Sequence, residues 1–409
     1  MRVTWRILIL LVLFSSCTGN KNDEKESGTL DTYVVVVSFD GFRWDYSDLY
    51  ETPNFDDMEL HGVKAEYMLP SFPTKTFPNH YALATGLYPD HNGIINNSFY
   101  ASELDGIYQI GDVQMVTNPD AYFGEPLWVT AEKQGVKSAS YFWVGSEADI
   151  QGVSPSYWYA YNHDVPYTPR VDKVMSWLKM PLSKRPGLIF LYFDQPDGIA
   201  HRYGPEHQET ADMVSYLDSV LGYLRSEIAE LEYGDRVNLI VLSDHGMGPT
   251  TPEKYVNITG YLKEEWTVSI IGGNPLYLIE PEEGYADSIT EALSAAEGVS
   301  AWQKDDIPER LHYGTSVRFP GIVAVADSLW SIDTREDASG YAGGAHGYDN
   351  AFTDMHAIFY AEGPAFKENY SAAPFSNVEL YGIVAKILAL DPVATDGDLE
   401  NVRHIFRSE

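Results

Sequence analysis

The chain has 409 residues, of which 44% are hydrophobic, and this is enough material for a large buried core in one domain or two. Aromatic residues make up 13% of the sequence, a share that excludes a disordered chain in spite of its acidity. The formal net charge of −33 argues against nucleic acid as a partner, and an anionic substrate would need a local source of positive charge, such as a bound metal ion.

The N-terminus has the pattern of a sorting signal. Arg2 and Arg6 precede the apolar run 7-ILILLVLF-14, which is too short to span a bilayer. The residues 15-SSC-17 resemble the lipidation site of bacterial lipoproteins, and Cys17 is the only cysteine in the chain. We therefore expect a lipid on Cys17 that anchors the protein in the bacterial cell envelope, at the periplasmic face or the cell surface. A plain secretory signal is the alternative.

Four apolar, β-branched runs predict buried strands: 33-YVVVVSF-39, 188-LIFLYF-193, 237-VNLIVLS-243 and 357-AIFYA-361. Their hydrophobicity is continuous rather than alternating, which is typical of parallel strands that are covered on both faces. A helical pattern over residues 210–231 lies between two of these runs. The alternation predicts an α/β sandwich around a mostly parallel sheet. The segment 141–170, rich in Tyr and Trp, is expected to be a loop.

The character of the sequence changes between about residues 265 and 340, where short strand-like runs surround a helix-like segment at 285–298. We interpret this region as a small α+β insertion and not as an independent domain. The expected organisation is a lipoprotein signal at residues 1–17, a polar, flexible tether at 18–30, and one domain at 31–409 that carries the insertion.

Acidic residues follow three of the predicted strands. Asp40 comes directly after the first, Asp197 and His201 come shortly after the second, and Asp244 and His245 follow the third. Ligands of open α/β sheets gather at the carboxyl ends of strands, so we expect these side chains to converge. The carboxylates would repel one another, and a bound metal ion would remove the conflict.

A third histidine, His346, lies in the glycine-rich segment 343-GGAHGYDN-350. Imidazole and carboxylate groups are the ligands that Zn²⁺ accepts, and the spacing of Asp197 and His201 places both on one face of a helical turn. Each residue has an ordinary alternative, because an aspartate after a strand often caps a helix and a single histidine is often a structural polar group. Their occurrence together at strand ends favours a metal site.

The stretch 71-SFPTKTFPNHYALATGL-87 contains two threonines at the expected start of a helix. Thr76 could cap the helix, whose first turn tolerates Pro78. The hydroxyl of Thr74 or Thr76 could instead attack an anionic group held at the helix N-terminus. The stretch by itself leaves both interpretations open.

Six motifs resemble, in the same order, the nucleotide pyrophosphatase/phosphodiesterase family of the alkaline phosphatase superfamily: 40-DGFR-43, 73-PTKTFPNHY-81, 85-TGLYPDHNGIINNSF-99, 196-PDGIAHRYGP-205, 243-SDHGM-247 and 344-GAHGYDN-350. The resemblance implies an alkaline-phosphatase-like sandwich with two zinc ions. It also implies hydrolysis of phosphodiester or pyrophosphate bonds of nucleotides through a covalent threonine intermediate, with release of a nucleoside 5′-monophosphate.

The family pattern implies a role for each matching position. One zinc ion would be held by Asp197, His201 and His346. The other would be held by Asp40, Asp244, His245 and the oxygen of the nucleophile, Thr76. Asn97 would hold a nonbridging phosphate oxygen, and three aromatic residues would contact the substrate, namely Phe77, Tyr161 and Tyr192.

The segment 143-WVGSE-147 departs from the family pattern by lacking a proline, which bears on substrate preference rather than on catalysis. Hydrolysis of choline-type or lipid diesters and phosphomonoesterase activity are therefore kept as alternatives. A non-enzymatic surface module with a degenerate site is disfavoured by the complete ligand set. The sequence makes no prediction of oligomeric state.

Overall fold

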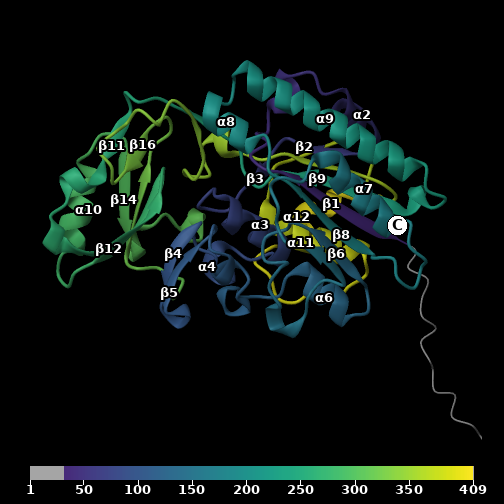
Figure 1. Cartoon of the computed structure of the whole chain (residues 1–409), viewed down its shortest axis with the longest axis horizontal. Helices are drawn as coiled ribbons and strands as arrows, with labels where there is room; N and C mark the ends of the chain where they lie inside the picture. The colour runs from purple at the N-terminus through teal and green to yellow at the C-terminus, as the bar shows by residue number, and fades with distance from the viewer. Residues whose placement is uncertain (1–31, 409) are drawn as a thin grey trace, which may run out of the picture. The chain divides into compact units, whose positions relative to one another are not determined.

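The four predicted strands form the centre of a larger sheet in the computed structural model, which describes residues 32–408 (Figure 1). Within these residues the sheet has eight strands, in the order β19 (Tyr370–Ala372), β2 (Val63–Ala65), β18 (Phe359–Glu362), β9 (Val237–Leu242), β1 (Tyr33–Phe39), β8 (Leu188–Phe193), β6 (Ser138–Tyr141) and β7 (Tyr157–Tyr159). The predicted signal, Cys17 and the tether lie outside the described residues, so the lipid anchor stays a prediction. No helix between residues 32 and 408 combines the length and apolar character needed to cross a bilayer.

The centre of the sheet is parallel, as the continuous hydrophobic runs predict. Strand β1 pairs in parallel with both β8 and β9, so that Val35 lies opposite Ile189 and Leu239, and all three side chains are buried. Strand β18 differs, because it runs antiparallel to its neighbours β9 and β2. It begins shortly after the 343–350 segment, which lies at the carboxyl edge of the sheet, so the chain runs back toward the opposite edge.

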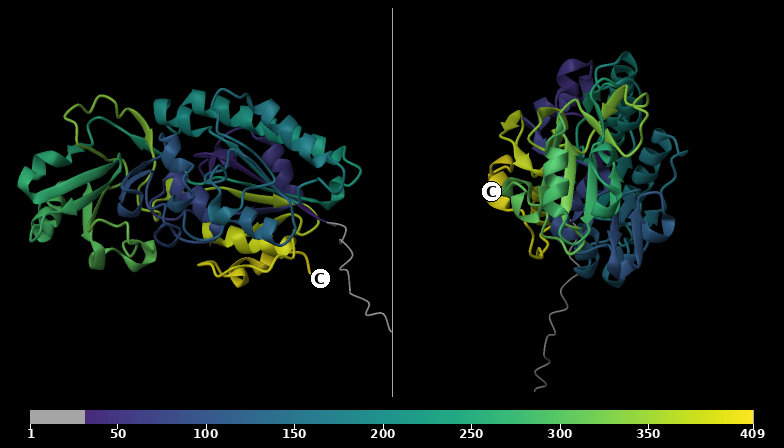
Figure 2. Two further views of the ribbon diagram at one scale, coloured as in Figure 1. Left: turned by 60° about the horizontal axis from the view of Figure 1, so that its bottom comes forward. Right: turned by 90° about the vertical axis from the view of Figure 1, so that its left-hand side faces the viewer.

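Helices cover both faces of the sheet (Figures 1 and 2). One layer contains α2 (Pro53–His61), α7 (Tyr167–Leu178) and α9 (Gln208–Ala229), and the other contains α3 (Thr76–Thr85), α6 (Leu127–Lys133) and α11 (Leu380–Ile387). The remaining helices are short: α1 (Tyr46–Leu49), α4 (Pro89–Asn92), α5 (Val113–Val116), α8 (Asp197–Tyr203) and α12 (Leu399–Val402). The α/β sandwich with a central, mostly parallel sheet is confirmed.

The region predicted as an insertion forms its own antiparallel sheet. Its strands follow the order β12 (Thr267–Gly273), β13 (Leu276–Pro281), β15 (Ile322–Ala326) and β14 (Val299–Gln303). Helix α10 (Ala286–Ser294) packs on it through the buried residues Ile289 and Leu293. Two further strand pairs, β10 (Gly248–Thr250) with β17 (Gly343–Ala345) and β11 (Tyr255–Asn257) with β16 (Ser331–Asp333), lie where the chain enters and leaves this region.

The other short strands form the hairpin of β4 (Ser98–Ala101) with β5 (Gly106–Gln109) and the pair of β3 (Met68–Leu69) with β20 (Phe375–Ser376). The prediction of a loop over residues 141–170 is wrong in part, because this segment contains β7 and the start of α7. Strand β7 is a three-residue edge strand, too short to produce a periodic pattern. Its aromatic side chains pack on Trp177 of α7, with ring centroids 6.3 Å apart for Tyr157 and 6.0 Å apart for Tyr159.

Candidate metal centre and active site

The ends of β1 and β9 bring three predicted ligands together. Asp40, Asp244 and His245 are all buried, and each offers a ligand atom within 4.8 Å of the others. His245 Nε2 lies 3.4 Å from Asp40 Oδ1 and 3.0 Å from Asp244 Oδ2. Asp244 Oδ1 accepts a hydrogen bond from the Gly41 N–H at 3.1 Å.

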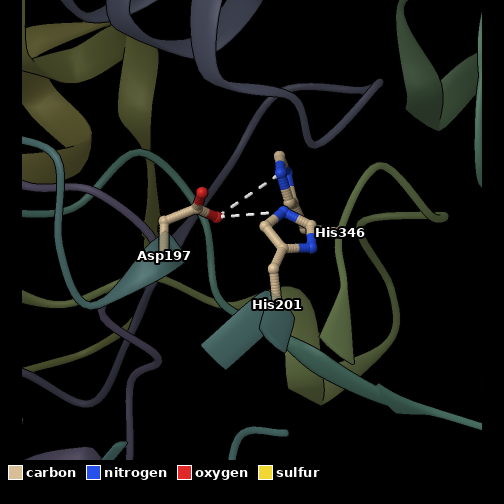
Figure 3. Close-up of side chains that lie close together, drawn as sticks. All are labelled: Asp197, His201 and His346. Atoms are coloured by element: carbon tan, nitrogen blue, oxygen red, sulfur yellow. Dashed lines mark ion pairs between the residues drawn. The ribbon is translucent and has the colours of Figure 1, made fainter. Parts of the chain in front are cut away.

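The second predicted set is Asp197, His201 and His346, and each of these residues also offers a ligand atom within 4.8 Å of the others (Figure 3). Asp197 begins α8, His201 lies one turn later, and His346 follows β17. Asp197 Oδ1 lies 3.3 Å from His201 Nε2 and 3.5 Å from His346 Nε2. Gly41, with φ of 70°, allows the chain after β1 to approach α8, because a Cβ there would lie 3.0 Å from the Asp197 Cα.

All three histidines are oriented in the same way. Their Nδ1 atoms lie 2.7 Å from Gly344 O for His201, 2.8 Å from Gly246 O for His245 and 2.8 Å from Thr74 O for His346. A carbonyl oxygen can only accept, so each Nδ1 carries the proton and each Nε2 presents its lone pair. This is the arrangement in which backbone acceptors hold metal-binding imidazoles.

The buried oxygens of both sets fit bound cations. Asp40 Oδ1, Asp197 Oδ1 and Asp244 Oδ2 are buried and find no hydrogen-bond partner among residues 32–408. Burial and repulsion from Asp244 and Asp197 raise the pKa of Asp40 well above its ordinary value. A divalent cation beside these oxygens would compensate for their lost hydration and separate their charges. Imidazole nitrogen and carboxylate oxygen are donors that zinc accepts.

Histidines change the pKa of the two other carboxyl groups, those of Asp197 and Asp244. Burial disfavours their ionised forms, but His201 and His346 lower the pKa of Asp197, and His245 and His80 lower that of Asp244. Asp197 and Asp244 therefore favour their charged forms beside the histidines. That charge is what a metal centre needs.

Thr76 lies beside the first set. Its Oγ1 is 3.3 Å from His245 Nε2, and it is the first residue of α3. The capping interpretation is wrong, because Lys75 occupies the cap position and its side chain donates to Asn274 O at 2.6 Å instead of capping the helix. The Thr76 hydroxyl is thus turned toward the ligands and not toward its own helix.

Asn79 fixes the loop that presents Thr76. Its Nδ2 donates to Pro73 O at 2.9 Å and Lys75 O at 2.8 Å, and its Oδ1 accepts from the Ser71 N–H at 2.8 Å. The side chain is completely buried, so loss of any of these bonds would leave polar groups without water. Asn79 therefore defines the path of the chain directly before the nucleophile candidate.

Thr74 connects this loop to the other ligand set. Its hydroxyl donates to Tyr348 O at 3.0 Å and accepts from the Gly347 N–H at 2.9 Å, while its carbonyl oxygen accepts from His346 Nδ1. Thr74 is therefore a scaffold residue that holds His346 in register with Thr76.

The substitution Thr74→Val is expected to weaken metal binding. It keeps the side-chain shape but leaves the Gly347 N–H and the Tyr348 carbonyl without partners, so the free energy of unfolding should fall by about 1–3 kcal/mol. Displacement of His346 should lower Zn²⁺ affinity by roughly 10- to 100-fold, measured by competition with a chromogenic chelator.

Two control variants separate this effect from general destabilisation. Thr74→Ser keeps the hydroxyl and should restore affinity. Thr130→Val removes a buried hydroxyl that bonds Glu125 and Tyr381 away from the site, so it should lower stability without changing affinity. Equal metal affinity in Thr74→Val and the wild type would contradict the scaffold role.

Asn97 and Phe77 are held next to Thr76. The Phe77 N–H donates to Asn97 Oδ1 at 3.1 Å, which orients the Asn97 amide so that its NH₂ group is available to a substrate. The Phe77 ring is half-buried, with its centroid 6.5 Å from that of Tyr108. Their predicted roles toward phosphate and base are compatible with these positions.

The other two predicted substrate residues, Tyr161 and Tyr192, differ in their exposure to solvent. Tyr161 is 47% exposed, and its ring centroid lies 6.1 Å from that of Tyr192. Glu147 accepts from the Tyr161 N–H at 2.8 Å, so the 143–147 segment positions Tyr161. Tyr192 is buried, and its hydroxyl donates to Asp40 Oδ2 at 2.5 Å, so it orients a ligand candidate. Substrate contact by either residue stays a prediction.

His80 also lies at the site, although it is not among the site residues predicted from the sequence. Its Nδ1 lies 3.0 Å from Thr76 O and 3.3 Å from Asp244 Oδ2, and its Nε2 lies 2.9 Å from Ser38 Oγ. The helical spacing of Thr76 and His80 was a signal that both lie on one face of α3. His80 therefore contacts both Thr76, the nucleophile candidate, and Asp244, a ligand candidate.

Comparisons with known proteins identify relatives of this chain. The family model for type I phosphodiesterase / nucleotide pyrophosphatase matches residues 34–349. Ectonucleotide pyrophosphatase/phosphodiesterase family member 3 of Rattus norvegicus is 32% identical over 403 residues, covering 96% of this chain and 46% of that protein. Venom phosphodiesterase 2 of Crotalus adamanteus is 32% identical over 406 residues, covering 97% of this chain and 50% of that protein. The chain thus spans about half the length of these curated relatives.

Solved structures share the fold. Murine ectonucleotide pyrophosphatase / phosphodiesterase 5, as an inactive variant in complex with AMP, matches with a TM-score of 0.87 and 34% identity, covering 92% of this chain and 100% of that chain. The human protein of the same name matches with a TM-score of 0.86 and 33% identity over the same shares. The extent of the family match, together with this identity and fold, shows that the chain belongs to the type I phosphodiesterase/nucleotide pyrophosphatase family of hydrolases.

Proposed function

We propose that the chain hydrolyses phosphodiester or pyrophosphate bonds of nucleotides and related compounds and releases a nucleoside 5′-monophosphate. The position of Thr76 carries this proposal: its Oγ1 stands at the start of a helix, 3.3 Å from one of six clustered ligand candidates. A hydroxyl at a helix N-terminus suits attack on an anionic phosphate. AMP, the kind of product proposed, is bound in the structure of the murine relative.

We further propose that two Zn²⁺ ions complete the site. One would be held by Asp197, His201 and His346, and the other by Asp40, Asp244 and His245 together with the Thr76 oxygen. Bound zinc supplies Lewis-acid chemistry, which lowers the pKa of an oxygen ligand and offsets the charge of a phosphate group. The unsatisfied carboxylate oxygens of both sets support this assignment.

The residues of the chain would perform the reaction in two displacements. Thr76 Oγ1 loses its proton to solvent and forms a bond to phosphorus, and the bond from phosphorus to the leaving group breaks with its electron pair on the departing oxygen. Water then loses a proton to solvent and forms a bond to phosphorus, and the threonine oxygen leaves with its electron pair and takes up a proton from solvent. The Asn97 NH₂ group would donate to a nonbridging oxygen as charge develops there.

Aromatic residues would bind the nucleoside. We propose that Phe77 and Tyr161 stack on the base, an interaction that contributes about 1–3 kcal/mol per base. Tyr192 would act mainly by orienting Asp40, to which its hydroxyl is bonded. A preference for phosphomonoesters would call for a cation near Thr76 that binds the terminal phosphate. It lacks support, because the cation nearest to Thr76 in the sequence, Lys75, is bonded to Asn274 O.

Comparing two chromogenic substrates tests this proposal. With Zn²⁺ present, kcat/KM for the p-nitrophenyl diester of thymidine 5′-monophosphate should exceed that for p-nitrophenyl phosphate by roughly 10- to 100-fold, because only the diester offers a base for stacking. p-Nitrophenyl phosphorylcholine serves as a diester without a base. Equal or faster turnover of the monoester, or preference for the choline ester, would contradict the assignment.

A further inference from the structure

Arg170 is a fully buried arginine close to the residues that are proposed to bind the base. It lies in the first turn of α7, and its side chain is 0% exposed. A guanidinium group loses its hydration when it is buried, so it is stable there only where acceptors and an opposite charge surround it. Arg170 has no part in the reaction proposed above, and its contacts show what it holds in place.

Each nitrogen atom of this guanidinium group bonds a different residue. Nε donates to Val165 O, Nη1 to Tyr192 O and Nη2 to Asp194 Oδ1, each at 3.0 Å. Val165 ends the segment 161–165, here called the Tyr161 loop, whereas Tyr192 lies in β8 and Asp194 follows that strand. The planar, rigid fork of the arginine therefore fastens the Tyr161 loop to the central sheet.

Asp194 gives the Tyr161 loop a second connection to the end of β8. Its side chain is 10% exposed, and its Oδ1 accepts from Arg170. Its Oδ2 lies 3.3 Å from Nδ1 of His163, which belongs to the Tyr161 loop. The loop is thus held at Val165 through Arg170 and at His163 through Asp194.

Phe142 connects the same guanidinium group to the Tyr161 ring. Arg170 Cζ lies 5.2 Å from the centroid of the Phe142 ring, and the Tyr161 ring packs edge-to-face against Phe142 with centroids 5.3 Å apart. Phe142 is buried, and its φ of 73° is uncommon for a bulky residue. Such a conformation persists only where the surroundings hold it, and the contact with Arg170 contributes to this.

We propose that Arg170 is a positioning residue for nucleotide substrates, which holds Tyr161 where its ring stacks on the base. Because Arg170 is fully buried, it acts through Val165 and Phe142 and not by touching the substrate. The inference rests on the proposed function, since stacking of Tyr161 on the base is itself part of that proposal.

Steady-state kinetics with two diesters test this role. The p-nitrophenyl diester of thymidine 5′-monophosphate carries a base, whereas methyl p-nitrophenyl phosphate carries none. Arg170→Lys keeps the charge but loses the planar fork. It should raise KM for the thymidine ester by roughly 5- to 50-fold and leave kcat within about 3-fold, because base stacking acts on substrate binding. KM for the methyl diester should stay within about 2-fold of the wild-type value.

A double variant shows whether Arg170 acts through Tyr161. Tyr161→Ala should also raise KM for the thymidine ester, and adding Arg170→Lys to it should change KM by less than about 2-fold, since the stacking ring is already lost. Thymidine 5′-monophosphate, used as a competitive inhibitor, should follow the same pattern. Inhibition by inorganic phosphate, which has no base, should be the same in all of these variants.

Two further variants separate positioning from general destabilisation. Arg225→Lys is the matched control, because Arg225 is a largely buried arginine of α9 that bonds Glu362 and Asn54 O. It should lower the melting temperature without changing KM for either diester. Asp194→Asn keeps an acceptor for Arg170 but removes the charge, so it should raise KM for the thymidine ester alone, by a smaller factor. It provides the test if Arg170→Lys does not fold.

The outcomes separate the two proposals. Equal rises in KM for both diesters, an unchanged KM for the thymidine ester, or additive effects of Arg170→Lys and Tyr161→Ala would overturn the positioning role while the activity itself stands. An unchanged KM in Tyr161→Ala would overturn stacking by that residue and the positioning role with it. A wild-type protein that cleaves neither diester would overturn the proposed function before any variant is compared.

Discussion

Thr76→Ala is expected to abolish hydrolysis of nucleotide diesters, with kcat lower by at least about 10³-fold. The variant lacks the oxygen that would bond to phosphorus, and the remaining groups can only bind and orient the substrate. The measurement is kcat with the p-nitrophenyl diester. Acid quenching of the wild-type enzyme, followed by mass spectrometry, should show a nucleotidyl group on the peptide that contains Thr76.

Two other threonine variants test whether this loss is specific. Thr76→Ser keeps a hydroxyl and should retain measurable turnover with the same covalent adduct. Thr85→Ala alters the last residue of the same helix, whose hydroxyl donates to Tyr81 O at 2.7 Å, and should leave kcat within a few-fold. Wild-type turnover by Thr76→Ala would rule out the covalent route.

Removal of divalent metal ions is expected to have the second largest effect. Dialysis against a chelator should eliminate activity, and addition of Zn²⁺ should restore it, because Asp40, Asp197 and Asp244 each have a buried oxygen that lacks a hydrogen-bond partner within residues 32–408 and is available as a ligand. At a free metal concentration of 1,000 times Kd, each site would contribute about 4 kcal/mol to the free energy of unfolding. The apo protein should therefore unfold at a lower temperature.

Metal content gives a readout that is independent of activity. The wild type should hold two ions per chain by elemental analysis, and His346→Ala and His245→Ala should each hold about one. His91→Ala, which removes a surface histidine paired with Asp396, is the matched control and should hold two. An active wild-type protein with fewer than two ions would contradict the dinuclear site.

The sequence predicted the sheet because its buried strands are long apolar runs. The boundaries of β1 and β8 agree with the predicted runs, and β9 differs by a single residue. Strand β7 was missed because three residues give no periodic signal. The direction of β18 was not predictable because it depends on the preceding 343–350 segment, which lies at the carboxyl edge of the sheet. The existence of β7 and the direction of β18 both depend on the neighbouring strands with which they pair.

Some of the site residues could likewise be predicted from local sequence, and others could not. Asp40, Asp197 and Asp244 could be proposed from their positions after strands, since the ends of parallel strands meet at one edge. The grouping of His346 with Asp197 and His201, and the choice of Thr76 over Thr74, came from the resemblance in ordered motifs and not from local chemistry. His80 was missed because its partners, Ser38 and Asp244, come from two different strands.

The sequence by itself determined the layered α/β architecture, the ligand types and the motifs of the family, because each depends on short-range patterns of hydrophobicity and side-chain chemistry. Tertiary structure alone decided how these parts are coupled. Thr74 holds the loop of His346, Tyr192 bonds Asp40, and His80 contacts Asp244. These pairs are far apart in the chain or lie on separate elements, and a contact of that kind has no local signature until packing fixes the distance and orientation of both partners.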